Sequence, residues 1–167
     1  MKRIAVKTFI LIMLAALIPA ACTTTSSVKE EDTPVQMANP FRTYKEIESA
    51  EETAGFELSV PEQIAKNYSA TVYRAISGKM IEVIYKNASL TDEIRIRKAA
   101  GNEDISGDYN TYDEDMTIII NGLQVESRGN AGKTHAATWQ DGNYSYSITS
   151  DEGLSLSSLK KIVEQVQ

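Results

Sequence analysis

Apolar and polar residues alternate over most of residues 69–149, and this two-residue period is typical of strands with one buried face. In the stretch DEIRIRK, for example, isoleucines alternate with charged residues. Two pairs of such stretches flank Asn121-Gly122 and Asp141-Gly142, dipeptides that favour the two-residue turns of β-hairpins. The pattern therefore predicts about six or seven antiparallel strands in a single curved sheet with one apolar face.

Helical patterns stand on both sides of this strand region. Thr43 with Glu46 has the spacing of a capping box, and Gly55 is suited to end the helix that would follow. Near the C-terminus, LSSLKKIVEQV repeats apolar residues at helical spacing, with Ser155 as the candidate N-cap. We expect a single α+β domain over residues 39–167, in which an N-terminal and a C-terminal helix cover one face of the sheet.

Residues 1–21 have the organisation of an export signal. Lys2, Arg3 and Lys7 precede the apolar run FILIMLAALIPAA, which is shorter than most membrane spans. The run ends before Cys22, the only cysteine, and LIPAAC resembles a bacterial lipobox. A lone cysteine cannot form an internal disulfide in an exported chain, and lipidation would explain it. The alternative is ordinary signal-peptidase cleavage that leaves a free thiol at this position.

Residues 22–38 have no hydrophobic periodicity and are rich in Thr, Ser and charged side chains, as is typical of a flexible tether. Loss of residues 1–21 would remove three positive charges and no negative one, which changes the formal charge from −6 to −9. An acidic, exported chain is poorly suited to bind nucleic acid. We expect a domain anchored to the cell membrane through lipidated Cys22, on the extracytoplasmic face.

The stretch GNEDISGDYNTYDED, residues 101–115, contains six carboxylates. An EF-hand loop beginning at Asp104 would need glycine where Tyr109 stands and a bidentate glutamate where Asp115 stands. A calcium site of another kind and a pair of catalytic acids remain alternatives, although pairs of acids are easy to find at this density. We interpret the stretch as a solvated strand connection, with Gly107 in a tight turn and no metal.

No catalytic set and no cofactor site is predicted. Strand alternation places His135, the only histidine, on one face with Ala137 and Trp139, and it lacks the further ligands that zinc requires. Trp139, Tyr144 and Tyr146 flank the second hairpin turn. Aromatic residues on paired strands usually stabilise the sheet. The alternative is an exposed aromatic surface that binds a sugar or a peptide.

Several stretches carry a family resemblance: NPFRTYKEIESAEETAGFELSVPE, MIEVIYKN, EDISGDYNTY, NGLQV and ATWQDGNYSYSIT, followed by the terminal helix. On these stretches the chain resembles an uncharacterised domain family of Gram-positive-type bacteria. Its members are surface lipoproteins or extracytoplasmic parts of membrane proteins, some of them anti-sigma-factor-like. The resemblance implies a fold and an extracytoplasmic location, and no reaction or catalytic residue.

The function that we expect is non-enzymatic: a lipid-anchored domain that binds an envelope peptide, a partner protein or a cell-wall component. The alternative is a carrier that holds an apolar ligand between the curved sheet and its helices. A hydrolase that uses the acidic residues is the third hypothesis.

Overall fold

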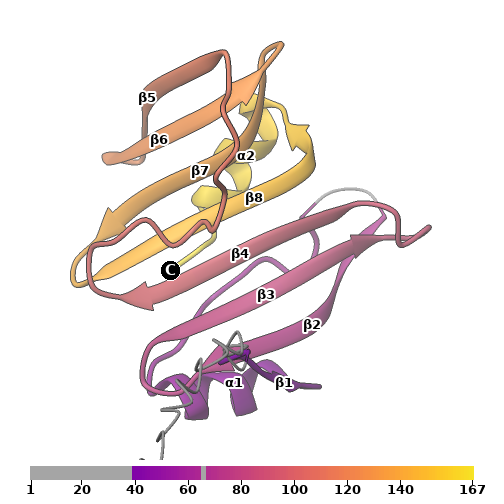
Figure 1. The fold of residues 1–167 in the computed structure, drawn as a ribbon, viewed down its shortest axis with the longest axis vertical. Helices are drawn as coiled ribbons and strands as arrows, with labels where there is room; N and C mark the ends of the chain where they lie inside the picture. The colour runs from indigo at the N-terminus through magenta and orange to yellow at the C-terminus, as the bar shows by residue number, and fades with distance from the viewer. Residues whose placement is uncertain (1–38, 65–66) are drawn as a thin grey trace, which may run out of the picture. The chain divides into compact units, whose positions relative to one another are not determined.

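The structure is a computed structural model, and it describes residues 39–64 and 67–167. The predicted signal peptide, Cys22 and the tether lie outside these described residues. Eight strands and two helices follow one another along the chain (Figure 1). They are β1 (Arg42–Tyr44), α1 (Ile47–Ala54), β2 (Tyr68–Ile76), β3 (Met80–Asn87), β4 (Glu93–Ala100), β5 (Glu114–Ile120), β6 (Leu123–Asn130), β7 (Lys133–Asp141), β8 (Tyr144–Leu154) and α2 (Leu156–Val163).

All eight strands form one open antiparallel sheet in the order β1-β2-β3-β4-β8-β7-β6-β5. The predicted α+β class is confirmed, but the sheet has eight strands instead of six or seven. Both predicted hairpins are present. The turn between β5 and β6 is Asn121-Gly122 as predicted, whereas the turn between β7 and β8 is Gly142-Asn143, one residue later than the predicted Asp141-Gly142. Neither helix in the described ranges is long and apolar enough to cross a membrane.

The additional strand is β1, which occupies residues that the sequence pattern assigned to the start of a helix. Thr43 lies in this strand opposite Arg74 of β2. The predicted capping box with Glu46 is therefore wrong: Glu46 is the N-cap of α1, and its side chain forms no capping hydrogen bond. Pairing with β2 gives hydrogen-bond partners to backbone N–H groups that would have none within the first turn of a helix. Gly55 ends α1 as predicted, with a φ of 82°.

One face of the sheet packs with both helices in a single hydrophobic core. Ala50 and Ala54 contribute from α1, and Leu159 and Ile162 from α2. The Oγ of Ser155 accepts a hydrogen bond from the Ser158 amide, so the predicted N-cap of α2 is confirmed. The sheet residues of the core come mostly from alternate positions along the strands, and they include Ile81, Val83, Tyr85, Ile94, Ile96, Ile120, Val125, Trp139, Tyr146, Ile148 and Leu154.

An irregularity in β7 changes the predicted alternation. β6 pairs Arg128 with Ala136 and Gly129 with Thr134, so His135 is an additional residue on β7 and forms a bulge. The register with β8 also shifts here, where residues 150–153 lie opposite His135 alone. Ala137 and Trp139 belong to the core, whereas the ring of His135 stacks on Tyr112 and lies over the opposite face. The prediction that His135 shares a face with Trp139 is therefore wrong, because a bulge moves the residues that precede it to the other face.

Candidate functional site

The face of the sheet opposite the core, here called the polar face, is crossed by the connection between β4 and β5. Because β8, β7 and β6 lie between those two strands, residues 101–113 must pass over all three (Figure 1). We call these residues the crossover segment. Its first part is held by side chains of the strands beneath it: Ser145 Oγ donates to the carbonyl of Gly101 at 3.0 Å, and Gln140 Nε2 donates to the carbonyl of Asn102 at 2.8 Å.

Arginines from two strands hold the middle of the crossover segment. Arg97 of β4 donates from Nη1 to the carbonyl oxygens of Ile105, at 2.9 Å, and of Ser106. Arg128 of β6 donates from Nη2 to Ser106 Oγ at 3.3 Å and to Asp104 Oδ2 at 3.0 Å. Ser106 is buried as a result. The crossover segment is thus hydrogen-bonded to the polar face and covers part of it, so it is only partly the solvated connection that we expected.

Eight residues, one from each strand, form a continuous row across the polar face. Strand register pairs each with the next, and all eight side chains are polar. We call them the polar row, and in spatial order they are Thr43, Arg74, Glu82, Arg97, Ser147, Thr138, Glu126 and Thr117. In the buried half of the row, Arg74, Glu82 and Arg97 are buried or half-buried and joined by ion pairs. In the other half, Ser147 is buried and Thr138 is half-buried, and Glu126 and Thr117 at its end are exposed, so we call it the exposed half.

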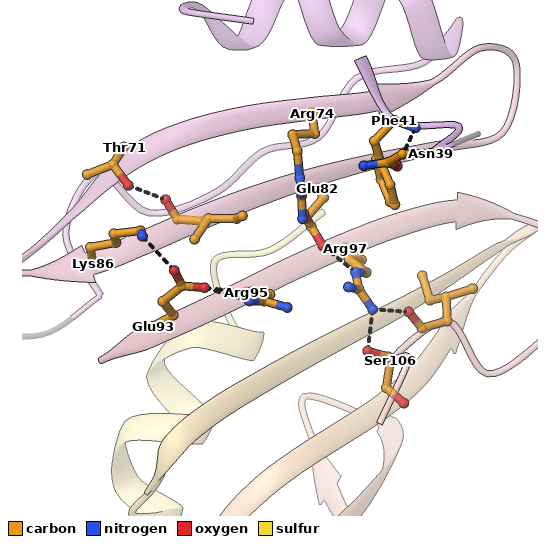
Figure 2. A network of polar contacts seen from close by, with 12 residues as sticks. Asn39, Phe41, Thr71, Arg74, Glu82, Lys86, Glu93, Arg95, Arg97 and Ser106 are labelled. Atoms are coloured by element: carbon orange, nitrogen blue, oxygen red, sulfur yellow. Dashed lines mark hydrogen bonds and ion pairs between the residues drawn. The ribbon is translucent and has the colours of Figure 1, made fainter. Parts of the chain in front are cut away.

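Glu82 is at the centre of the buried half and has no exposed surface. Its Oε1 accepts from Arg74 Nε and its Oε2 from Arg97 Nε, each at 2.6 Å (Figure 2). The Arg74 guanidinium also lies 4.9 Å from the ring centroid of Phe41. Sequence alternation alone would place Glu82 in water. Because both carboxylate oxygens are bonded to cations, this site has no vacant acceptor for a ligand and serves stability.

The exposed half of the polar row borders a hollow of about 680 Å³. No lysine, arginine or histidine lines it, whereas three carboxylates do: Glu103, Asp104 and Glu126. We call it the acidic hollow. Its other lining residues come from the crossover segment and from β5 to β8: Asn102, Thr117, Gly122, Leu123, Gln124, Thr138, Trp139, Gln140, Ser145 and Tyr146.

β5 forms the outer border of this hollow and the edge of the sheet. It has a partner strand, β6, on one side only. The two strands pair without a register shift over all seven residues of β5. Met116 is 45% exposed and Ile119 is 61% exposed. Natural edge strands are usually protected by charged side chains, proline, a bulge or a very short length. β5 carries charges only at its first two residues, Glu114 and Asp115, and its other five residues have none of these features.

A second hollow, of about 480 Å³, lies beside the crossover segment above β4, β8 and β7. Arg95 and His135 line it, together with Asp108 and Tyr112. These groups already have partners: Arg95 bonds to Glu93, and Asp108 accepts from the Tyr112 hydroxyl at 2.6 Å. His135 Nδ1 lies 3.2 Å from the carbonyl oxygen of Ser150. The end of the crossover segment contacts the sheet through the stacking of Tyr112 on His135 and through the Asp113 amide, which donates to Asn130 Oδ1 at 2.8 Å.

The acidic residues of the crossover segment do not gather into a metal site. No group of three or more possible ligands is present in residues 39–64 and 67–167. Asp104 accepts from the Ser106 amide at 2.8 Å and pairs with Arg128. Burial acts to raise the pKa of Asp104, but hydrogen bonds from Ser106 and the charge of Arg128 lower it below the ordinary value.

Two of the three candidate surface aromatics, Tyr144 and Tyr146, lie beside the buried Lys98, and the third, Trp139, stacks on Tyr146. Trp139 and Tyr146 are each 4% exposed and stack with ring centroids 5.3 Å apart, while Tyr144 is half-buried. Lys98 Nζ lies 4.7 Å from the ring centroid of Tyr144 and 5.4 Å from that of Tyr146, and it donates to the carbonyl of Glu57 at 2.7 Å. Strand register places all three aromatics on the core face, so they form no exposed aromatic surface.

A third hollow, of about 600 Å³, adjoins α1 and β2. Apolar residues such as Leu58 and Val60 line it, but so do four glutamates: Glu48, Glu51, Glu57 and Glu62. Carboxylates are unfavourable neighbours for an apolar ligand. The buried side chains on the core face of the sheet belong to one hydrophobic cluster.

Comparisons with known proteins returned no family model, no curated protein and no solved structure similar to this chain. The resemblance to a family of surface lipoproteins therefore stays a prediction.

Proposed function

We propose that this protein is a lipid-anchored extracytoplasmic binding domain whose β5 edge pairs with an extended segment of an envelope peptide or protein. One observation carries the proposal: β5 presents a seven-residue edge with large exposed apolar side chains, and the five residues that follow Glu114 and Asp115 have none of the usual protection. Strand addition to such an edge is a recurring mode of peptide recognition, in which the backbone gives affinity and alternate side chains give specificity.

The two edges of the sheet differ in a way that favours β5 as the binding edge. β1 at the opposite edge has three residues, too few to pair with a long partner. Exposed Ile119 lies on the polar face beside Thr117 of the acidic hollow, and exposed Met116 lies on the other face. An added strand would therefore find an apolar contact on each face of β5.

Anchoring through Cys22 is a separate part of the proposal and rests on the sequence pattern before the domain. Lipidation would keep the domain at the membrane surface, where envelope segments are available. Cys22→Ser should release the domain from the membrane fraction or block its maturation, as measured by fractionation and immunoblotting. Unchanged membrane retention of Cys22→Ser would contradict lipid attachment.

The binding edge can be tested with a displayed library of random nine-residue peptides, selected against the wild-type protein. Selected peptides should slow hydrogen exchange at alternate amides of β5, because these amides have no partner on β6 in the free protein. Ile119→Lys should abolish the protection, because lysine on an edge blocks strand addition. The matched control is Leu90→Lys, which places the same residue at another exposed apolar position, 65% exposed, in the turn after β3.

The proposal fails if selected peptides protect another region, or if Ile119→Lys and Leu90→Lys bind them equally well.

A further inference from the structure

We infer that the segment bound at β5 is basic, with a lysine or arginine placed opposite Thr117 so that its charged group reaches Glu126. This inference rests on the proposed strand addition and specifies its ligand. The inference is based on the polar row, which ends at Thr117 on the edge strand and has Glu126 as its next member. An added strand would extend the row by one position, directly beside Thr117.

Strand geometry allows this contact. Neighbouring strands lie about 4.8 Å apart, so the added residue is about 10 Å from the Glu126 backbone, measured across Thr117. Lysine and arginine have long side chains that can extend over a short one such as threonine. The glutamate side chain of Glu126 is exposed on the same face. The two charged groups can therefore meet above Thr117.

The charge of the surrounding surface favours a cation at this point. The lining of the acidic hollow has three carboxylates and no basic residue. Asp104 is paired with Arg128, whereas Glu103 and Glu126 form no ion pair with any described residue. The whole chain is also acidic, with a formal charge of −6. Complementary charge directs a basic segment to this edge and excludes acidic ones.

The positions next to Thr117 define the rest of the pattern. Asp115 and Ile119 lie on the polar face on either side of it along β5. Side chains of the ligand that face these three residues would be apolar at Ile119, basic at Thr117, and basic or polar at Asp115. The ligand is thus an extended segment of the type apolar-x-basic-x-(basic or polar), counted along β5 from Ile119 to Asp115.

A second copy of this chain is a poorer occupant of the edge. Antiparallel pairing of β5 with itself about Thr117 would bring Glu126 of each copy to the same region of the polar face, about three strand spacings apart. Both acidic hollows would then border one interface without a cation. Like charges across an interface suppress association.

The test uses three synthetic nine-residue peptides that share one alternating sequence of threonine and valine, with isoleucine opposite Ile119. They differ only at the residue opposite Thr117, which is lysine, norleucine or glutamate. Titration should show the lysine peptide binding roughly two- to fivefold more tightly than the norleucine peptide at low salt, the range for an exposed ion pair. The glutamate peptide should bind most weakly, and added salt should remove the differences.

Glu126→Gln should reduce the affinity for the lysine peptide to that for the norleucine peptide. Glu164→Gln, which removes the same charge from the exposed end of α2, should leave the preference intact. Hydrogen exchange at β5 distinguishes a failure of the basic-ligand inference from a failure of strand addition itself. If all peptides protect β5 equally well, the basic ligand is refuted and strand addition stands. If none protects β5, strand addition fails as well. Concentration-dependent protection of β5 without peptide would assign the edge to a second copy and overturn the inference.

Discussion

Nε of Arg97 on β4 lies 2.6 Å from Oε2 of Glu82 on β3, and the glutamate side chain is completely buried. The same arginine donates from Nη1 to the carbonyl oxygens of Ile105 and Ser106. A single guanidinium thus joins the buried ion cluster of the sheet to the segment that crosses its polar face. Loss of the Glu82 charge should therefore destabilise both the ion cluster and the crossover segment.

Glu82→Gln should lower the free energy of unfolding by about 3 kcal/mol, because it leaves Arg74 and Arg97 without their counter-ion in a buried site. The control is Glu93→Gln, which removes the same charge from partly exposed ion pairs with Lys86 and Arg95 and should cost at most about 1 kcal/mol. Urea denaturation measures both. Equal costs for the two variants would contradict the buried role of Glu82.

Local sequence signals predicted the hairpins because a two-residue turn is determined by the residues within it. Asn121 and Gly122 have φ values of 49° and 85°, the positive values that this turn requires. The N-cap at Ser155 and the stop at Gly55 were predictable for the same reason. The candidate site could be predicted only in part. The Asn121-Gly122 turn predicted the pair of strands that border the site, but Thr117 and Glu126 were not predicted as site residues, because nothing local shows that β5 is the edge strand.

The strand order depends on contacts between residues far apart in the sequence, and it was not predicted. β8 lies between β4 and β7, which forces residues 101–113 across the polar face. The crossing buries Ser106 and brings its carbonyl oxygen to Arg97. Side chains that strand alternation would place in solvent therefore become part of a second, polar core. The bulge at His135 was missed because a single additional residue leaves no clear signal in the pattern.

Leu159→Ala should lower the free energy of unfolding by about 2–5 kcal/mol, because Leu159 is fully buried in the core formed by α2 and the sheet. Leu156→Ala on the same helix is the control: this leucine is 44% exposed, and its truncation should cost less than about 1 kcal/mol. Chemical denaturation of the ligand-free protein compares them. A cost below about 1 kcal/mol for Leu159→Ala would indicate a mobile lid instead of a core helix.

Gly107→Val should destabilise the protein by about 2 kcal/mol. Gly107 has a φ of 62°, and a Cβ there would lie 2.7 Å from Nη1 of Arg97. Asp113→Asn, an exposed change in the same segment, should stay within about 0.5 kcal/mol of the wild type. Calcium should leave the melting temperatures of the wild type and of Asp113→Asn unchanged. A calcium-dependent rise that Asp113→Asn abolishes would restore the metal hypothesis.

Lys98→Met should change how stability depends on pH, because Lys98 is a buried cation in the core. Burial lowers the pKa of its ammonium group below the ordinary value of 10.5. The unfolded chain therefore binds more protons than the folded protein between the lowered pKa and pH 10.5. In that window the free energy of unfolding contributed by Lys98 rises with pH, by at most about 1.4 kcal/mol per pH unit.

Urea denaturation from pH 7 to pH 9.5 measures this dependence and avoids the range in which tyrosines of the unfolded chain ionise. The stability of the wild type relative to Lys98→Met should increase as the pH rises. Lys160→Met replaces an exposed lysine of α2 and should follow the wild-type curve. The opposite result would be a wild type that loses stability relative to Lys98→Met as the pH rises. It would mean that the rings of Phe56, Tyr144 and Tyr146 and the Glu57 carbonyl stabilise the charged ammonium group by more than burial destabilises it.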